Sequence, residues 1–358
     1  MGYSLKKIIY HTLKYPLIAW LALKSYPLAK KAAMTPNKVY LDTPYQGQPI
    51  LLIALYQQGK LRPDIARLLV LAKEMGLYVI GVNNATLTAA LHDYFDCYIE
   101  RVNFGRDFAS YKVGFEKVFH LLNNAHCPRL LMLNDSVYYD TSRLKPFLDR
   151  LVHPAVEVLG ATDNHEITYH FGSFCLSIDG RILRHPLFQR YWAEYKSTDV
   201  RLLVIYRGEL ELSRCLKACV SNPFQFRALY DLGFLERTLS DKANMETFLL
   251  LSRRSPHLAP HLLRSRLSAS PSITEILAYS KQRGQIHLNA AFLVFAGLPL
   301  VKLDGFYRGV FSEEDVNNIC NQLPTMEAEE LKSLLLRRSY GGDAPFEWKK
   351  ILFMWGLI

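Results

Sequence analysis

Residues 49–84 decide the fold of this chain, and they read PILLIALYQQGKLRPDIARLLVLAKEMGLYVIGVNN. The run Ile50–Leu55 is short, unbroken and apolar, as expected of a parallel strand that is buried on both faces. Pro63 then opens a helical pattern that continues to about Met75. A second apolar run at 78–82 follows, so we expect a strand, a helix and a strand in a right-handed crossover.

The same alternation continues along the chain, with a third strand, a third helix and a fourth strand. This order predicts an α/β fold, in which a mainly parallel sheet is flanked by helices. The further elements that we expect are strands at 97–100, 130–133, within 170–178 and at 200–206, and helices at 107–122 and 209–218. From residue 227 onward the pattern is mainly helical. We therefore divide the chain into a basic amphipathic arm at 1–45, a catalytic domain at 46–226 and a mainly helical region at 227–358.

The composition of the 358 residues is that of a globular protein, with 50% hydrophobic and 21% charged residues. It excludes a disordered chain and a membrane protein with many spans. The net charge of +10 favours a polyanionic partner: nucleic acid, anionic lipid or a phosphorylated substrate. Residues 1–41 contain seven lysines and no acidic residue, which leaves the rest of the chain near neutral. That distribution argues against nucleic acid as the partner.

The two ends of the chain combine apolar, aromatic and basic residues. The apolar run at 17–23 is too short to span a bilayer, so we expect a helix that lies on an anionic membrane surface. Residues 346–358 have a similar character and predict a second membrane-associating segment. The alternative for both ends is an amphipathic helix docked on the body. The six cysteines form no Cys-x-x-Cys pair and indicate reduced thiols of a cytosolic protein.

Polar residues follow the third and fourth predicted strands, where α/β sheets bind ligands. After the fourth strand, Asp135 can present a carboxylate to a ribose or to a metal-bound diphosphate; the alternative is a helix cap. After the third, Gly105 allows a close approach of the backbone, and Arg106 or Lys112 could face phosphate. Asp107 could equally be the cap of the next helix. Neither a P-loop nor a Gly-x-Gly-x-x-Gly motif is present.

Two further groups of polar residues are candidates. Glu209 or Glu211 could act as the general base for an acceptor hydroxyl, although carboxylates at this position more often stabilise a helix start. Asp163, His165 and His170 could supply a metal ligand or a contact to an acceptor, and the alternative is a hydrogen-bonded loop.

Five motifs in register resemble the rhamnan synthesis protein F family, a group of bacterial glycosyltransferases of surface polysaccharide and lipopolysaccharide assembly. The resemblance covers residues 50–220, with a weaker extension from Asn289 to Lys302. The motifs are Arg101-x-Asn103-x-Gly105-Arg106-Asp107-Phe108-x-Ser110-Tyr111-Lys112, Leu133-Asn134-Asp135-Ser136-x-Tyr138, Gly160-x-Thr162-Asp163-Asn164, His170-x-x-Ser173-Phe174 and Glu209-x-x-Leu212-Ser213.

The resemblance implies a GT-A-like fold that binds a nucleotide-diphospho-sugar, with dTDP-rhamnose favoured, and transfers the sugar with inversion. It implies Glu209 as general base and Asp135 as a ligand of Mg²⁺ or Mn²⁺. The residues it implies around the nucleotide are Asn103, Gly105, Arg106, Asp107, Lys112, Asn134 and Ser136, and those on the acceptor side are Asp163, Asn164, His170 and Lys302. The wider GT-A pattern is Asp-x-Asp, whereas this sequence offers Asp135 alone, so Arg106, Lys112 or Lys302 is the alternative counter-charge for the diphosphate.

The partners expected from this reading are a nucleotide-sugar donor, a glycan or lipid-linked glycan acceptor and a membrane surface, and no nucleic acid. The expected location is peripheral, on the cytoplasmic face of the bacterial inner membrane. A non-catalytic scaffold of a polysaccharide assembly complex is the alternative function.

Overall fold

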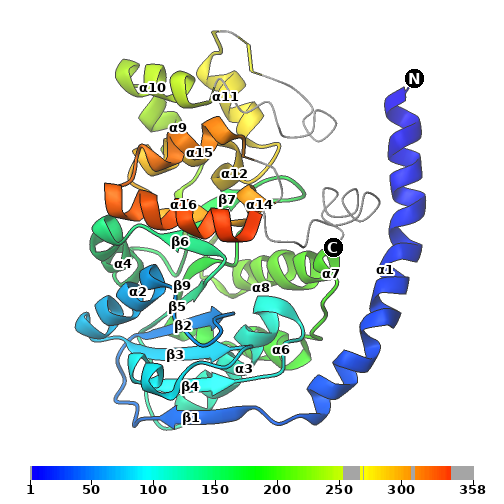
Figure 1. Cartoon of the computed structure of the whole chain (residues 1–358), viewed down its shortest axis with the longest axis vertical. Helices are drawn as coiled ribbons and strands as arrows, with labels where there is room; N and C mark the ends of the chain where they lie inside the picture. The colour runs from blue at the N-terminus through cyan, green and yellow to red at the C-terminus, as the bar shows by residue number, and fades with distance from the viewer. Residues whose placement is uncertain (1, 253–266, 269, 308–310, 340–358) are drawn as a thin grey trace.

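The computed structural model describes the chain except for residues 1, 253–266, 269, 308–310 and 340–358. Its centre is a nine-stranded sheet in the order β1-β4-β3-β2-β5-β9-β7-β10, with β8 paired to β7 (Figure 1). The strands are β1 (Lys38–Asp42), β2 (Ile50–Leu55), β3 (Tyr78–Asn83), β4 (Cys97–Glu100), β5 (Arg129–Asn134), β7 (Val158–Asn164), β8 (His170–Phe171), β9 (Cys175–Asp179) and β10 (Phe226–Tyr230).

Most of the sheet is parallel, as the sequence predicts. β4, β3, β2 and β5 run in the same direction, and β10 is parallel to β7. β9 is antiparallel to both β5 and β7, so β7 again points the same way as β5. The carboxyl ends of these strands therefore meet at one edge of the sheet. The predicted α/β fold with a mainly parallel sheet is confirmed.

Helices cover both faces of the sheet. On one face, α3 (Arg106–Leu121), α6 (Pro186–Glu194) and α8 (Glu211–Cys219) pack around Trp192. On the other face lie α2 (Pro63–Glu74) and α4 (Leu144–Val152). Alternate residues of β2 enter the two cores: Leu52 packs on the first and Ile53 on the second. This double burial explains why the strand is apolar throughout.

The C-terminal region forms a third core of its own. Its helices are α9 (Leu232–Leu239), α10 (Lys242–Ser252), α11 (Ile273–Ser280), α12 (Gln285–Leu288), α13 (Ala290–Phe295), α14 (Asp304–Tyr307), α15 (Glu313–Cys320) and α16 (Thr325–Ser339). A small antiparallel sheet of β6 (Val137–Tyr139) and β11 (Leu300–Lys302) joins this region to the end of β5 (Figure 1). Because Lys302 pairs with Val137, the region reaches the carboxyl edge of the main sheet.

The strand expected at 200–206 is wrong. This segment forms α7 (Arg201–Val204) and continues into one turn of π-helix, η3 (Ile205–Leu210). Val204 and Leu210 are buried, whereas Tyr206 and Arg207 are exposed. A short apolar run does not distinguish a buried strand from a buried helix face, and here the helix forms. The other short helices are η1 (Ala89–Tyr94), η2 (Thr141–Arg143), α5 (Gly180–Leu183) and η4 (Pro223–Gln225).

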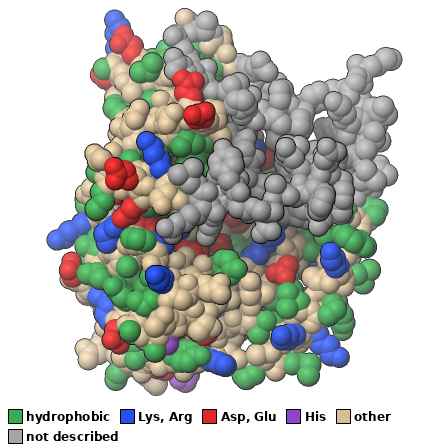
Figure 2. All heavy atoms as spheres, viewed as in Figure 1, with side chains coloured by type: hydrophobic (Ala, Val, Ile, Leu, Met, Phe, Trp, Pro, Cys, Tyr) green, Lys and Arg blue, Asp and Glu red, His purple; other side chains and the backbone are tan. Residues whose placement is uncertain are grey.

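The predicted arm is a 33-residue helix, α1 (Gly2–Met34), followed by the edge strand β1 (Figure 1). From residue 15, where its side chains are described, to residue 34 none is buried, and Leu23 is 75% exposed. Figure 2 shows hydrophobic and basic side chains together along the side where α1 runs. Among the described helices, none is long and apolar enough to cross a membrane. The predicted second membrane segment, 346–358, lies outside the described residues.

Candidate active site

The turn after β5 and strand β11 bring distant predicted residues together at the carboxyl edge of the sheet. Lys302 Nζ donates a hydrogen bond to Ser136 Oγ at 2.7 Å and lies 4.8 Å from the centre of the Phe174 ring. Asn134 Oδ1 accepts from the Ser136 hydroxyl at 2.6 Å and from its backbone N–H at 3.1 Å. The side-chain Nδ2 of Asn134 donates to Asp107 Oδ2 at 3.0 Å.

We call these residues, together with Asp135, the edge cluster: Asp107, Asn134, Asp135, Ser136 and Lys302. Asp107 joins it because α3 starts at the end of β4. The turn before α3 depends on Gly105, whose φ of +86° favours glycine. A Cβ at this position would lie 2.7 Å from the Ala109 Cβ and 2.8 Å from the Ser197 Cβ. The Gly105 N–H donates to Asp199 Oδ1 at 2.6 Å, which fixes the start of the helix.

The edge cluster contains two carboxylates in one electrostatic environment. Burial and, to a lesser degree, the nearby Asp135 carboxylate raise the pKa of Asp107 to about 6, although Lys302 and Arg106 oppose the shift. Because the pKa of Asp107 is higher in the folded state than in the unfolded state, its protonated form stabilises the fold at pH values below the unfolded pKa. This contribution is lost as the pH rises through about 6. At neutral pH the folded protein therefore retains an ionised Asp107 at a cost in stability.

Replacing Asp107 by Asn should therefore raise the free energy of unfolding by about 1 kcal/mol at pH 7.5, with little gain at pH 4. The amide oxygen of the new side chain can still accept from Asn134, so the hydrogen bond is retained. Urea denaturation at the two pH values measures the difference. Asp149→Asn, at a highly exposed side chain, serves as control and should show no such pH dependence. A stability loss in Asp107→Asn at pH 7.5 would contradict the prediction.

The loop that precedes α3 is held from inside by Arg101. Its guanidinium donates to Val102 O at 2.8 Å and to Ser110 Oγ at 2.8 Å, and burial lowers the pKa of Arg101 to about 10. Arg106 is exposed, has a φ of +53° and donates from Nε to Asp199 O at 2.9 Å. Asn103 is exposed and accepts from Asn84 at 3.1 Å. Arg106 thus lies on the rim of the edge cluster, where its charge acts on Asp107, whereas Asn103 contacts the residue that follows β3.

Lys112 is placed elsewhere by the structure. Its Nζ donates to Ala193 O at 3.2 Å and to Tyr195 O at 2.9 Å, at the end of α6. The carbonyl oxygens at a helix end are ordinary partners of a lysine side chain. The expectation that Lys112 neutralises a diphosphate has no support in this geometry, because the amine is engaged away from the edge cluster.

Glu209 lies on the π-helical turn η3, and Ser173 connects it to the edge cluster. The Ser173 hydroxyl donates to Glu209 Oε1 at 3.2 Å, and the next residue is Phe174, which lies under Lys302. Gly208 permits this arrangement, since a Cβ there would lie 2.7 Å from the Phe108 ring. Single π-helical turns occur often at functional sites. The structure therefore brings Glu209 to the same edge of the sheet as Asp135.

The predicted acceptor-side residues at the end of β7 form a separate network. Asp163 is 2% exposed, and its carboxylate accepts from Gln285 Nε2 at 2.6 Å and from the Leu232 N–H at 3.2 Å. His170 is buried and contacts Thr168 O at 2.7 Å. Both side chains are thus engaged in contacts within the protein. Asn164 is half-buried, and its Oδ1 accepts from the Glu166 N–H at 2.8 Å.

Several residues near Lys302 and Asp135 were not predicted from the sequence. Asp304 contacts His287 Nε2 at 2.9 Å and Arg201 at 3.7 Å. Burial would raise the pKa of Asp304, but His287, Lys302 and Arg201 hold it well below its usual range. Gln57 and Arg62, which contact Asp135, were missed as well. No local motif marks these positions, because only the tertiary fold brings them together.

The edge cluster fits a divalent cation only in part. Among the described residues, no group of three or more His, Cys, Asp and Glu could hold a metal ion. Mg²⁺ and similar ions, however, are often bound by one or two carboxylates together with substrate phosphates. Asp135, with Asp107 in its electrostatic environment, offers that kind of donor set. The residues therefore fit a cation shared with a bound diphosphate better than a closed metal site.

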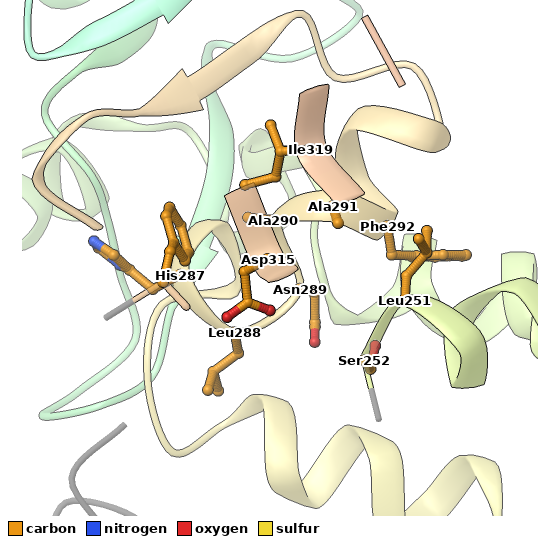
Figure 3. A pocket seen from close by; sticks show the side chains of 11 residues that line it. Leu251, Ser252, His287, Leu288, Asn289, Ala290, Ala291, Phe292, Asp315 and Ile319 are labelled. Atoms are coloured by element: carbon orange, nitrogen blue, oxygen red, sulfur yellow. The ribbon is translucent and has the colours of Figure 1, made fainter. Parts of the chain in front are cut away.

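Two hollows lie away from the edge cluster. A cavity of about 10 Å³ in the C-terminal region is lined by residues that include His287, Asn289 and Asp315 (Figure 3). That volume holds at most one water molecule, and the buried Asn289 Oδ1 lacks a hydrogen-bond partner in the described part of the protein. The second, of about 290 Å³, lies beside Asp42 and Lys117, at the opposite edge of the sheet.

Comparison with known proteins gives partial matches. No family model matches the chain. It is 31% identical over 120 residues to the virulence protein VirA of Vibrio anguillarum, which covers 33% of this chain and 38% of VirA. It is 23% identical over 171 residues to the uncharacterized protein y4gN of Sinorhizobium fredii, covering 46% and 44% of the two chains. The chain thus matches less than half the length of these curated relatives.

Among solved structures, the chain is similar to a mannosyltransferase of Pyrobaculum calidifontis in complex with GDP-Man and Mn²⁺. The identity is 14%, the TM-score is 0.32, and the match covers 98% of this chain and 96% of the other. A TM-score at this level supports no argument about fold or activity.

Proposed function

We propose that this protein is a glycosyltransferase that moves a sugar from a nucleotide-diphospho-sugar to a surface polysaccharide or lipopolysaccharide acceptor. The observation that carries the proposal is the edge cluster with Glu209 beside it. Carboxylates, a lysine and polar side chains converge where open α/β sheets bind their ligands. Cationic and anionic groups side by side suit a diphosphate that is shared with a metal ion.

The proposed mechanism assigns one role to each group. Glu209 takes the proton from the acceptor hydroxyl as that oxygen attacks the anomeric carbon, and the sugar is transferred with inversion. Lys302, held by Ser136, stabilises the negative charge on the leaving diphosphate, and Arg106 on the rim adds to it. Asp135 would hold Mg²⁺ or Mn²⁺, which supplies further charge neutralisation when bound.

The finer assignments come from the resemblance to the rhamnan synthesis protein F family. It favours a deoxyhexose, with dTDP-rhamnose as donor, and a glycan or lipid-linked glycan as acceptor. Asn164 is the proposed acceptor-side contact. No family model supports or refines this choice of sugar.

We propose that α1 attaches the protein to the cytoplasmic face of the bacterial inner membrane. Its described part exposes Trp20, Leu23 and Tyr26, with Lys24 close to the Trp20 ring, and aromatic and basic residues together suit an anionic interface. Flotation with anionic liposomes tests this, using a chain that lacks residues 1–35. The deletion must stop there because β1 starts at Lys38 and belongs to the sheet. Equal flotation of the two proteins would remove the membrane role of α1.

Thermal-shift measurements with dTDP-, UDP- and GDP-sugars, each with and without Mn²⁺, test the donor. A ligand at 100 times its Kd should stabilise the fold by about 2.7 kcal/mol. Selective stabilisation, followed by sugar transfer in a turnover assay, would support the proposal. If none of the three classes shifts the melting temperature, a non-catalytic scaffold becomes the better description.

A further inference from the structure

In the described part of the protein, the side chain of Asp135 is held through one of its two carboxylate oxygens. Its Oδ2 accepts a hydrogen bond from the Tyr56 N–H at 2.8 Å and a second from Gln57 Nε2. Among the residues that the structure describes, none donates to its Oδ1. The carboxylate is therefore oriented, with one oxygen occupied by protein donors and the other left for a ligand.

Gln57 is itself fixed on every side. The side chain is buried, and its Oε1 accepts from the Arg62 N–H at 3.1 Å. Because Oε1 faces a donor, the amide nitrogen has to face Asp135, so the amide cannot be flipped without losing both hydrogen bonds. Its backbone N–H donates to Asn83 Oδ1 at 3.0 Å, and its carbonyl accepts from Asn83 Nδ2 at 2.8 Å. The end of β3 thus pins the residue that orients Asp135.

The main chain of Asp135 is held separately, by Arg62. The buried guanidinium donates to Asp135 O at 3.0 Å and forms an ion pair with the fully buried Asp64. Asp64 in turn accepts from the Tyr139 N–H at 3.0 Å. Arg62 therefore shapes the backbone turn after β5, whereas Gln57 acts on the side chain alone. Removing the Gln57 amide takes the donor from the carboxylate and the acceptor from the Arg62 N–H, while the Arg62 guanidinium still supports the turn.

We propose that Gln57 is a positioning residue that presents Asp135 Oδ1 to the cation and diphosphate of the donor. The identity of that ligand rests on the proposed function. A hydrogen bond to a ligating carboxylate is the kind of outer contact whose loss costs 10–100-fold in metal affinity or activity.

Two variants of Gln57 separate positioning from general stability. Gln57→Met keeps the length of the side chain and removes the donor, while Gln57→Glu places a second negative charge next to Asp135. The matched control is Gln285→Met, since Gln285 is also buried and donates to a buried carboxylate, that of Asp163. The free Mn²⁺ signal in electron paramagnetic resonance gives the affinity for Mn²⁺ alone, and initial rates give kcat and the KM of the donor.

We expect Gln57→Met to bind Mn²⁺ about 10–100-fold more weakly and to lose a similar factor in kcat, with little change in the KM of the donor. Gln57→Glu should also lose turnover, because its second negative charge repels the Asp135 carboxylate from this orientation. Gln285→Met should leave the Mn²⁺ affinity and kcat unchanged. If Gln57→Met does not fold, Gln57→Glu carries the test.

Each result has one reading. Wild-type Mn²⁺ affinity in Gln57→Met and wild-type kcat in both Gln57 variants would overturn the positioning role. A different outcome is that the wild type binds Mn²⁺ but transfers no sugar, while Gln57→Met binds Mn²⁺ more weakly. The positioning role then stands and the proposed function fails. A wild type that neither binds Mn²⁺ nor turns over a nucleotide-sugar would remove both.

Discussion

Replacing Asp135 by Asn should lower kcat by about 10³-fold or more while the melting temperature stays close to that of the wild type. The Tyr56 N–H and Gln57 Nε2 both donate to Oδ2, so the amide oxygen of the new side chain takes that place. Its NH₂ group then replaces Oδ1 and faces the ligand with a positive edge. The turn keeps its hydrogen bonds, and the site loses its charge.

Initial rates and thermal unfolding of the same preparation check this expectation. Asp149→Asn is the matched control, because this side chain is 65% exposed and contacts His153, the residue that follows α4. It should retain wild-type turnover. An Asp135→Asn protein with near wild-type turnover would show that this carboxylate is not part of the reacting site, even if the glycosyltransferase assignment held.

Glu209→Gln should lose about 10²- to 10⁴-fold in kcat, with the affinity for the donor nearly unchanged. The amide oxygen can still accept from the Ser173 hydroxyl, so the side chain should keep its place while losing the ability to take a proton. Comparing donor affinity with turnover separates this role from binding.

Glu211 provides the control for this second experiment. It lies two residues further on, is 47% exposed and is paired with Arg214. Glu211→Gln should therefore be close to wild type. Loss of donor binding together with turnover in Glu209→Gln would contradict the role of general base. A larger loss in Glu211→Gln than in Glu209→Gln would move the role to the neighbouring carboxylate.

Much of the fold could be predicted, because the physical causes of these elements are local. The central strands are apolar throughout since both of their faces are buried, and α2 starts at a proline that suits a first helical turn. Residues 200–206 could not be predicted in this way. Their apolar positions fit a strand as well as a helix, and contact with the first core determined the outcome.

The site was less predictable, because its geometry comes from tertiary contacts. The position of Asp135 after an apolar strand marked it as a candidate, and Lys302 came from the family resemblance. Lys112 looked equally suitable by sequence, yet the packing of α3 against α6 directs its amine to carbonyl oxygens. Gln57 has no motif around it. Its role depends on three strand ends that meet only in the folded sheet.

The pairing of β6 with β11 determines when the edge cluster becomes complete during synthesis. Every strand of the main sheet has been synthesised once Tyr230 is added to the chain, but Lys302 is added about 70 residues later. Contacts of such long sequence separation form late in folding, and domains made first tend to fold first. A nascent or truncated chain that ends before β11 would therefore hold its carboxylates without the lysine, so catalytic competence would report a finished C-terminal region.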